Sequence, residues 1–302
     1  MDAIAVEDRE NGHHYRLAGP RPKEWNLNAP MKCMFLNIWL GKLPPYFPFF
    51  LKSTLLNAGM FQWYLFTDQI SEPVRLSESL FLIPFSWEDV VKIVKAEGVQ
   101  PRFGALHLAS YRMLLPYSQC VDELMRSEKF THFGTFDLDV IYGDIRAHLP
   151  GDAARYLMIS GHPGLNKDDV SPRGCGPFTI HRRDAVEILR RFPRFQQELN
   201  SISCSNPFDE NRAYFDWITA ENHPVYYRGT NIQPVREAFY PSEEFRARWT
   251  RGRLTVSDGD RLIEGAFFHF MKFKRLASFH VNEADAESDY FTVSKDGISL
   301  LP

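Results

Sequence analysis

Short apolar runs of strand length alternate with segments of helical spacing from residue 32 onward, and this alternation limits the possible folds more than any other feature. Residues 32–40 and 61–67 are long enough for buried strands, and the apolar positions of 47–58 recur at helical spacing. Further strands are expected at 81–84, 130–141, 156–160, 178–181, 225–229 and 266–273. Alternating strands and helices are typical of an α/β domain, so we predict a mixed, mainly parallel sheet flanked by helices.

Helices are expected between these strands, and one of them has a clear start signal. Ser86 is followed three residues later by Asp89, which is the spacing of a capping box. The other helical segments are 105–116, 121–127, 184–192 and 209–220. No linker-like change of composition interrupts residues 31–275, so we expect a single domain there. Residues 1–30 are expected to form a flexible leader or a strap over the surface, and 276–302 a loosely packed C-terminal tail.

The composition excludes several classes of protein. The chain has 35 Lys plus Arg against 38 Asp plus Glu, and this near-neutral balance argues against nucleic-acid binding through phosphate contacts. Charged residues make up 24% of the chain, which is an ordinary fraction for a folded protein and not for a disordered one. Aromatic residues reach 14%, which favours a packed core with some rings left to stack on a sugar or a base.

The spacing of the cysteines and the hydropathy of the chain indicate where in the cell the protein is located. The four cysteines are widely spaced and form no C-x-x-C pair, so neither a structural zinc site nor a disulfide framework is expected. No apolar run reaches the roughly 18 to 20 residues of a membrane helix, and the first ten residues lack the apolar stretch of a signal peptide. We therefore expect a cytoplasmic protein.

The sharpest local signal is the segment 136–144, which reads FDLDVIYGD. Asp137 and Asp139 stand two residues apart at the end of a predicted strand, so both carboxylates face the same side with α-carbons about 6.6 Å apart. Such a pair can hold a hard divalent ion between itself and a diphosphate. In open α/β sheets, ligands bind at the carboxyl ends of strands. The alternative is that both aspartates merely end the strand. Asp144 is expected to cap the short helix that follows.

This segment resembles the D-x-D region of glycosyltransferases of the GT-A type. More narrowly, it is similar to a bacterial family associated with cell-surface polysaccharide loci. Four landmarks of that family occur here in the same order, and they span residues 32–275: a first strand leading into GKLPPYF at 41–47, FTD at 66–68, the aspartate motif, and HFMKFKR at 269–275. The resemblance implies a single GT-A domain, which is Rossmann-like, and a transferase that uses a nucleoside-diphosphate sugar.

The resemblance also implies roles for residues around a metal. Asp139 matches the aspartate that binds the ion directly, and Asp137 matches the one that faces the ribose or shares the ion. His269 matches a late histidine that serves as a further ligand, and Lys272 is then placed to meet a diphosphate oxygen. A histidine ligand favours Mn²⁺ over Mg²⁺. The alternative for His269 is a core histidine whose hydrogen bonds are satisfied.

Two further positions are assigned to the donor by the same resemblance. Asp68 ends a strand where this fold type contacts the nucleobase or ribose, and its alternative is a strand-ending turn. Arg112 lies on a helix that lines the donor site and can neutralise phosphate charge bidentately, with a surface salt bridge as the alternative. Family members tend to have an acidic residue where this chain has Ser110.

The acceptor side is implied by another acidic pair. Asp209 and Glu210 open a predicted helix where many GT-A enzymes place carboxylates facing the acceptor hydroxyl, and an inverting enzyme needs such a general base. The alternative is simpler, because acidic residues are favoured in the first turn of any helix. The implied acceptor is a glycan or a lipid-linked glycan, and the latter would allow peripheral association with the inner face of a membrane.

Three functional hypotheses follow. The first is a metal-dependent glycosyltransferase in surface polysaccharide synthesis. The second is a metal-dependent nucleotidyltransferase or phosphohydrolase, since an aspartate pair with a divalent ion serves those reactions too. Sugar-nucleotide synthesis usually brings a glycine-rich, basic loop after the first strand, whereas residues 36–45 contain one glycine and two prolines. The third is a catalytically inactive glycan-binding protein on the same fold.

Overall fold

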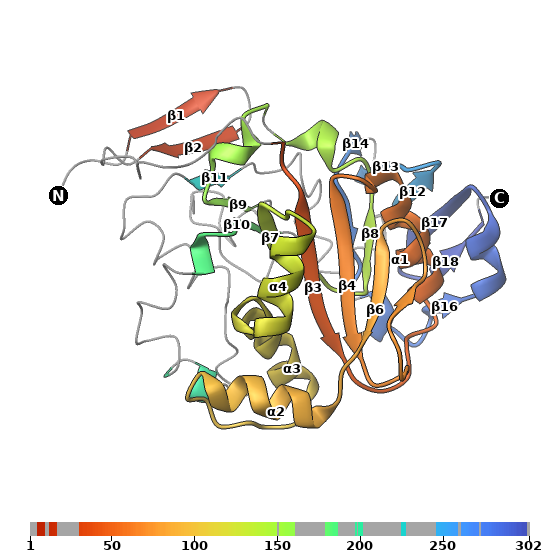
Figure 1. The fold of residues 1–302 in the computed structure, drawn as a ribbon. Helices are drawn as coiled ribbons and strands as arrows, with labels where there is room; N and C mark the ends of the chain where they lie inside the picture. Colours follow the sequence, from red (N-terminus) through yellow and green to blue (C-terminus); the bar gives the residue numbers. More distant parts are fainter. Residues whose placement is uncertain are drawn as a thin grey trace.

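The computed structural model describes residues 5–9, 12–16, 30–149, 151–160, 179–186, 197, 199–201, 225–227, 246–258, 261–271 and 273–300. Within these ranges the strands form one ten-stranded sheet, one six-stranded sheet and one two-stranded pair (Figure 1). The protein is therefore a mixed α/β fold, as the alternation of strands and helices predicts.

The centre of the large sheet is parallel. Its strands are β3 (Cys33–Trp39), β4 (Phe61–Thr67), β6 (Leu80–Pro84) and β7 (His132–Thr135), in the order β7-β3-β4-β6. All three pairings are parallel. The strands expected at 32–40, 61–67 and 81–84 are thus confirmed, and their near-continuous apolar sequences fit strands that are covered on both faces.

The flanks of the large sheet are mostly antiparallel. On one side β5 (Val74–Arg75) pairs with β6. On the other side follow β10 (Thr179–Arg182), β9 (Met158–Ser160) and β11 (Val225–Tyr227), and among these described strands β9 and β11 pair in parallel. The expectation of a mainly parallel sheet therefore holds for the centre and is wrong for the flanks.

The large sheet ends in an N-terminal hairpin. Strands β1 (Ala5–Arg9) and β2 (Gly12–Arg16) pair with each other, and β2 also pairs with β11. The hairpin lies at the far edge of the sheet in Figure 1. These ten residues are therefore paired strands, and the leader expected at 1–30 stays a prediction for the residues outside the described ranges.

Helices cover one face of the central strands. They are α2 (Trp87–Ala96), α3 (Ala105–Tyr111), which continues into the 3-10 helix η2 (Arg112–Tyr117), and α4 (Gln119–Ser127). Their apolar residues form one core cluster with Met34 and Leu36 of β3. The expected capping box is confirmed, since the Ser86 hydroxyl accepts from the Asp89 amide and the Asp89 carboxylate accepts from the Ser86 amide.

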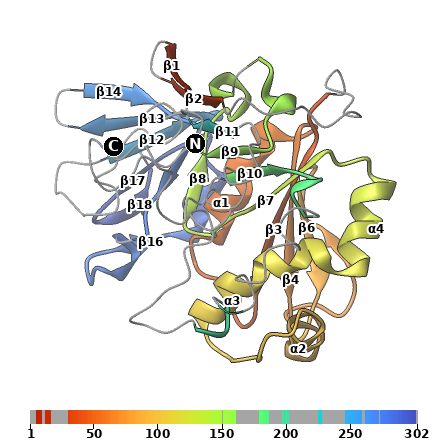
Figure 2. The ribbon, with the colours of Figure 1, turned by 90° about the vertical axis from the view of Figure 1, so that its left-hand side faces the viewer.

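Helix α1 (Phe47–Thr54) and the second sheet cover the opposite face (Figure 2). Phe49 and Phe50 share a core cluster with Phe35 of β3. The helix passes into η1 (Leu55–Asn57), as expected for 47–58. The sequence thus places large aromatic side chains on both sides of β3, and α1 forms the layer between the two sheets.

The second sheet consists of six strands from the C-terminal part of the chain. They are β12 (Arg246–Thr250), β13 (Arg253–Asp258), β14 (Arg261–Glu264), β16 (His280–Val281), β17 (Tyr290–Ser294) and β18 (Gly297–Ser299), in the order β14-β13-β12-β17-β18-β16. Phe291, Val293 and Ile298 are buried in the same cluster as α1. The expected loosely packed tail is therefore wrong, since β16–β18 complete this sheet.

The strand expected at 130–141 is interrupted. Strand β7 ends at Thr135, and β8 (Val140–Tyr142) leaves the large sheet to pair with β15 (Phe267–His269). Between them Phe136 turns inward and stacks on Phe50, with ring centroids 5.3 Å apart. The aspartate motif thus lies where the chain changes from one sheet to another.

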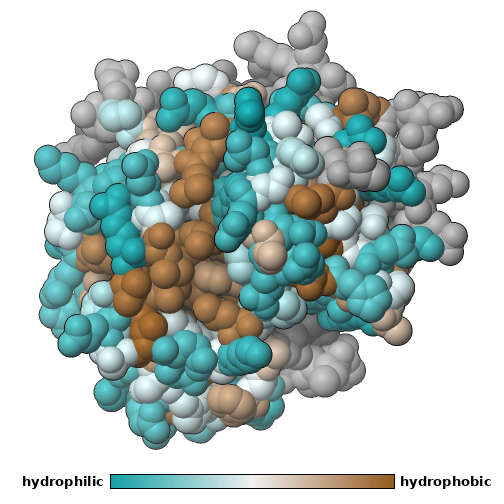
Figure 3. Space-filling model, turned by 90° about the vertical axis from the view of Figure 1, so that its right-hand side faces the viewer, coloured by the Kyte–Doolittle hydropathy of each residue, from teal (hydrophilic) through white to brown (hydrophobic). Residues whose placement is uncertain are grey.

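The short helical turns join these layers. They are η3 (Arg146–His148), η4 (Ala153–Arg155), η6 (Phe273–Arg275) and η7 (Glu283–Glu287). Figure 3 shows apolar side chains in several patches on the face at the right-hand side of Figure 1, and the largest patch lies left of the centre of that view. None of the described helices combines the length and the apolar character needed to cross a membrane.

Candidate metal centre

The pairing of β8 with β15 brings the late histidine to the aspartate motif. Asp137 and Asp139 lie in the link between β7 and β8. His269 is the residue of β15 that faces Val140, next in sequence to Asp139. The Phe270 amide donates to the Asp139 carbonyl at 3.1 Å and extends the pairing by one more hydrogen bond. The backbone, and not a flexible loop, therefore fixes where these three side chains meet.

The three side chains present their ligand atoms to a common point. Nε2 of His269 lies 3.3 Å from Oδ2 of Asp139 and 3.8 Å from Oδ2 of Asp137. One ligand atom from each residue lies within 4.8 Å of the other two. Two carboxylate oxygens and one imidazole nitrogen form a donor set that suits Mn²⁺ better than Mg²⁺. The residues present thus fit the group that the resemblance implies.

Asp139 is a buried carboxylate in its charged form. Its side chain is 6% exposed, and burial alone would raise its pKa. His269 and Lys274 lower the pKa by more than burial raises it, so the pKa of Asp139 lies below its ordinary value. Asp139 therefore carries a negative charge at neutral pH.

Arg112 reaches the other aspartate from η2. Its Nη1 lies 2.5 Å from Oδ1 of Asp137 and donates to the Phe136 carbonyl at 2.7 Å. The Arg112 side chain is 3% exposed and that of Asp137 is 24% exposed, so the surface salt bridge left open by the sequence is wrong and the pair is partly buried. Arg112 holds a ligand of the candidate centre, and its expected contact with a phosphate stays a prediction.

Lys274 belongs to the centre, although no role was assigned to it from the sequence. Its Nζ lies 2.6 Å from Oδ2 of Asp139. The residue sits in η6, at the second lysine of the HFMKFKR motif. A signal was thus available, but the motif offers two lysines and the sequence favoured Lys272. Lys272 lies outside the described residues.

Tyr46, from the GKLPPYF landmark, lies close to the aspartates and Lys274 of the candidate centre. Burial raises its pKa most, and the negative charges of Asp139 and Asp137 raise it further, so the phenol stays protonated at neutral pH. Its ring packs edge-on against Phe270 at a centroid distance of 5.2 Å, and Nζ of Lys274 lies 5.9 Å from the ring centre. Sequence reasoning missed Tyr46 as a member of the site, because an aromatic residue before a helix is ordinarily core.

Asp68 follows β4 at the same edge of the sheet and takes part in a turn. Its Oδ1 accepts from the Gly41 amide at 2.7 Å and from Nε2 of Gln69 at 2.8 Å. The Gly41 bond, followed by the Gln69 bond, lowers the pKa of Asp68. These bonds connect the loops after β3 and β4, as the turn interpretation expects. The contact of Asp68 with a nucleotide stays a prediction.

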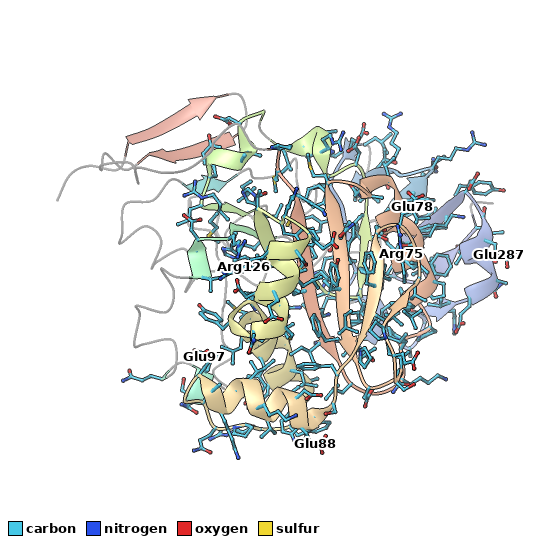
Figure 4. All side chains as sticks on the ribbon, in the orientation of Figure 1. Arg75, Glu78, Glu88, Glu97, Arg126 and Glu287 are labelled. Carbon is cyan, nitrogen blue, oxygen red and sulfur yellow. The ribbon has the colours of Figure 1, made fainter. Side chains whose placement is uncertain are left out.

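Several anchors hold the segment after β8. Asp144 accepts from the Ala147 amide at 3.2 Å and so bonds to the first turn of η3, but it stands one residue before the N-cap, which is Ile145 and not Asp144 as expected. The buried amide of Asn57 donates to the Gly143 carbonyl at 2.8 Å and accepts from the Ile145 amide at 2.9 Å. Figure 4 labels six charged side chains outside this segment, and all of them except the half-buried Glu97 are exposed.

The acidic pair proposed for the acceptor, Asp209 and Glu210, lies outside the described residues. The same holds for residues 161–178, between the strands expected at 156–160 and 178–181. The predicted helix at 209–220 lies there as well, and 184–192 is described only in part. A catalytic base at Asp209 or Glu210 therefore stays a prediction.

The model of a family described as "Family of unknown function (DUF6625)" matches residues 35–300. This range contains the parallel strands, the aspartate motif, His269 and the second sheet. No curated protein matches the chain.

Proposed function

The chain belongs to the DUF6625 family, and we propose that it is a metal-dependent glycosyltransferase of the GT-A type. It would move a sugar from a nucleoside diphosphate to a glycan or a lipid-linked acceptor. The observation that carries this proposal is the convergence of Asp137, Asp139 and His269, whose ligand atoms lie within 4.8 Å of one another.

The place of the cluster in the fold supports the proposal. Asp137 follows β7 directly, and Asp68 follows the parallel strand β4, so both lie beyond the carboxyl ends of the central strands. This edge is where open α/β sheets bind ligands, and nucleotides among them. The positions of Asp68 and Asp137 in the fold are thus consistent with a donor site at that edge.

The chemistry of the ligand set supports a divalent ion. Asp137, Asp139 and His269 would hold Mn²⁺ or Mg²⁺, and such an ion neutralises the charge that develops on a departing nucleoside diphosphate. Asp139 is ionised and almost fully buried, so it can act as an anionic ligand without first losing a proton.

The surrounding residues would prepare the site for the donor. Arg112 bonds to one oxygen of Asp137 and leaves the other toward His269. Tyr46 remains a neutral phenol, so it can donate a hydrogen bond to an anionic group at neutral pH. Fixed donors and charges of this kind stabilise developing charge without having to rearrange. Lys272 would add a positive charge for the diphosphate, as the resemblance implies.

The competing nucleotidyltransferase hypothesis finds less support in the loop after β3. Such enzymes cradle phosphate with free backbone amides of a glycine-rich loop. Here the loop has one glycine, and the Gly41 amide already donates to Asp68 at 2.7 Å. The Gly41 amide, which could otherwise bind phosphate, thus connects the loop after β3 to the loop after β4.

A donor-turnover assay tests the proposal. The protein is incubated with Mn²⁺ and single sugar nucleotides of each common base, and the release of nucleoside diphosphate is followed. We expect slow hydrolysis of one donor, lost in Asp139→Asn and His269→Ala and kept in Asp144→Asn, which alters a half-buried carboxylate that bonds to the Ala147 amide. Release of nucleoside monophosphate together with sugar 1-phosphate, or formation of nucleoside triphosphate when pyrophosphate is added, would instead indicate the second hypothesis. Turnover of no donor would favour a protein that only binds glycans.

A further inference from the structure

Each aspartate of the candidate centre already faces a cation of the protein. Arg112 lies 2.5 Å from Asp137, and Lys274 lies 2.6 Å from Asp139. Two carboxylates are thus matched by two positive groups, and the imidazole of His269 completes the cluster. A divalent ion entering this cluster meets little net negative charge, unlike an ion that enters a set of unpaired carboxylates.

The two cations are not equally fixed. Arg112 is 3% exposed and is held by a second bond to the Phe136 carbonyl. Lys274 is 28% exposed and sits on the single turn η6. Its ammonium ends a flexible stem, whereas the guanidinium of Arg112 is a planar group bonded at two points. If one cation has to leave for a metal, Lys274 is the one that can move.

We propose that Lys274 is an internal counter-ion, which pairs with Asp139 in the metal-free protein and moves to the diphosphate when metal and nucleotide bind together. This inference rests on the proposed function and assigns a binding order to the same site. An ammonium and a divalent ion on one buried carboxylate oxygen repel each other strongly, because the low local dielectric screens them little. The diphosphate supplies the negative charge that gives Lys274 a new partner.

A coupling between the two ligands follows. The metal binds weakly alone because it competes with Lys274 for Asp139. It binds well with the nucleotide, since the diphosphate draws Lys274 away. By linkage, each ligand raises the affinity of the other by the same factor. Lys274 thus lowers the affinity for the metal in the nucleotide-free protein and raises the affinity for the nucleotide in the metal-bound protein. A purely structural lysine does not produce this pair of effects.

The test uses Mn²⁺ titrations of the full-length protein, followed by calorimetry. Lys274→Met keeps the length of the apolar stem and removes the charge, and Lys274→Arg keeps the charge. Arg275→Met is the matched control, because Arg275 is the exposed cation next in sequence. Each protein is titrated with Mn²⁺ alone, and then with UDP, GDP, CDP and ADP at saturating Mn²⁺. Unfolding curves of each variant check that it folds, and Lys274→Gln replaces any Lys274→Met preparation that does not.

We expect two opposite effects of removing the charge. Lys274→Met should bind Mn²⁺ alone about tenfold more tightly than the unaltered protein, and it should bind the diphosphate about tenfold more weakly in Mn²⁺, within the usual range of site coupling. Lys274→Arg and Arg275→Met should change neither affinity by this much. Because one affinity rises while the other falls, general destabilisation cannot imitate the result.

The failures of the two proposals differ. Equal Mn²⁺ affinity in Lys274→Met and the unaltered protein, with binding still abolished by Asp139→Asn, would overturn the role of Lys274 and leave the metal centre intact. An absence of Mn²⁺ binding in every variant, with and without nucleotide, would overturn the metal centre as well.

Discussion

The guanidinium of Arg112 and the carboxylate of Asp137 form a partly buried ion pair in which only one of the two aspartate oxygens contacts the arginine. Oδ1 lies 2.5 Å from Nη1 of Arg112, and Oδ2 lies 3.8 Å from Nε2 of His269. The same Nη1 donates to the Phe136 carbonyl, so η2 holds both the backbone and the side chain of the motif. The orientation of Asp137 toward the candidate metal position therefore depends on a residue from a separate helix.

Replacement of Arg112 should destabilise the fold. Arg112→Met leaves the Asp137 carboxylate and the Phe136 carbonyl without their donor. Removing one partner of a buried pair costs about 3–5 kcal/mol, and we expect about 2 kcal/mol here, because Asp137 is 24% exposed. Urea unfolding measures the loss. The double variant with Asp137→Asn should recover part of it, and Arg126→Met, which breaks an exposed pair with Asp122, should cost at most about 1 kcal/mol.

Gly143 has no room for a side chain. A Cβ there would lie 2.5 Å from the Gly265 carbonyl oxygen and 2.7 Å from Cβ of Leu254, both of which are held in place. We expect Gly143→Ala to lower the free energy of unfolding by about 2–3 kcal/mol through overpacking. The control is Gly151→Ala, whose Cβ meets nothing within 4 Å and should change stability by less than about 0.5 kcal/mol. Equal unfolding midpoints for both variants would contradict the packing of β8.

Two buried histidines should make stability depend on pH. Burial lowers the pKa of His132 to about 3, with a further contribution from Arg182, and burial together with His132 lowers the pKa of His181 to about 3. In the unfolded chain these two histidines take up protons near pH 6.5, whereas in the folded protein their side chains stay neutral at that pH. Stability is therefore complete above pH 6.5 and falls as the pH decreases toward 3, by up to about 1.4 kcal/mol per pH unit for each histidine.

Urea unfolding between pH 7.5 and 4.5 measures this slope. His132→Gln should remove about half of it, and His280→Gln, which alters an exposed histidine, should leave it unchanged. A slope that is the same in His132→Gln as in the unaltered protein would show that other groups cause the pH dependence.

The sequence predicts the central part of the fold well, because the local pattern there agrees with the environment. Strand β4 has the bounds expected from its apolar run, and the capping box at Ser86 starts α2 as expected. The interruption at Phe136 could not be predicted in this way. An apolar run indicates a strand, but it does not say that Phe136 stacks on Phe50 and that β8 pairs with β15.

The second sheet was missed for a related reason. Its strands alternate buried and exposed residues, as in Arg246–Thr250, where only Ala247 and Trp249 are buried. Such strands contain many charged residues and resemble loops in composition. At the candidate centre, the carboxylates and His269 were predictable from their chemistry. Lys274 and the Asp137–Arg112 pair were not, because they depend on how η6 and η2 pack in three dimensions.

The central claim is that Asp139 belongs to a metal centre that binds a nucleoside diphosphate. Calorimetric titration of UDP, GDP, CDP and ADP into the protein, with and without Mn²⁺, tests it most directly. We predict that one diphosphate binds only when Mn²⁺ is present, and that this binding is lost in Asp139→Asn and kept in Asp144→Asn. Binding of no diphosphate under either condition, or equal binding by Asp139→Asn, would contradict the claim.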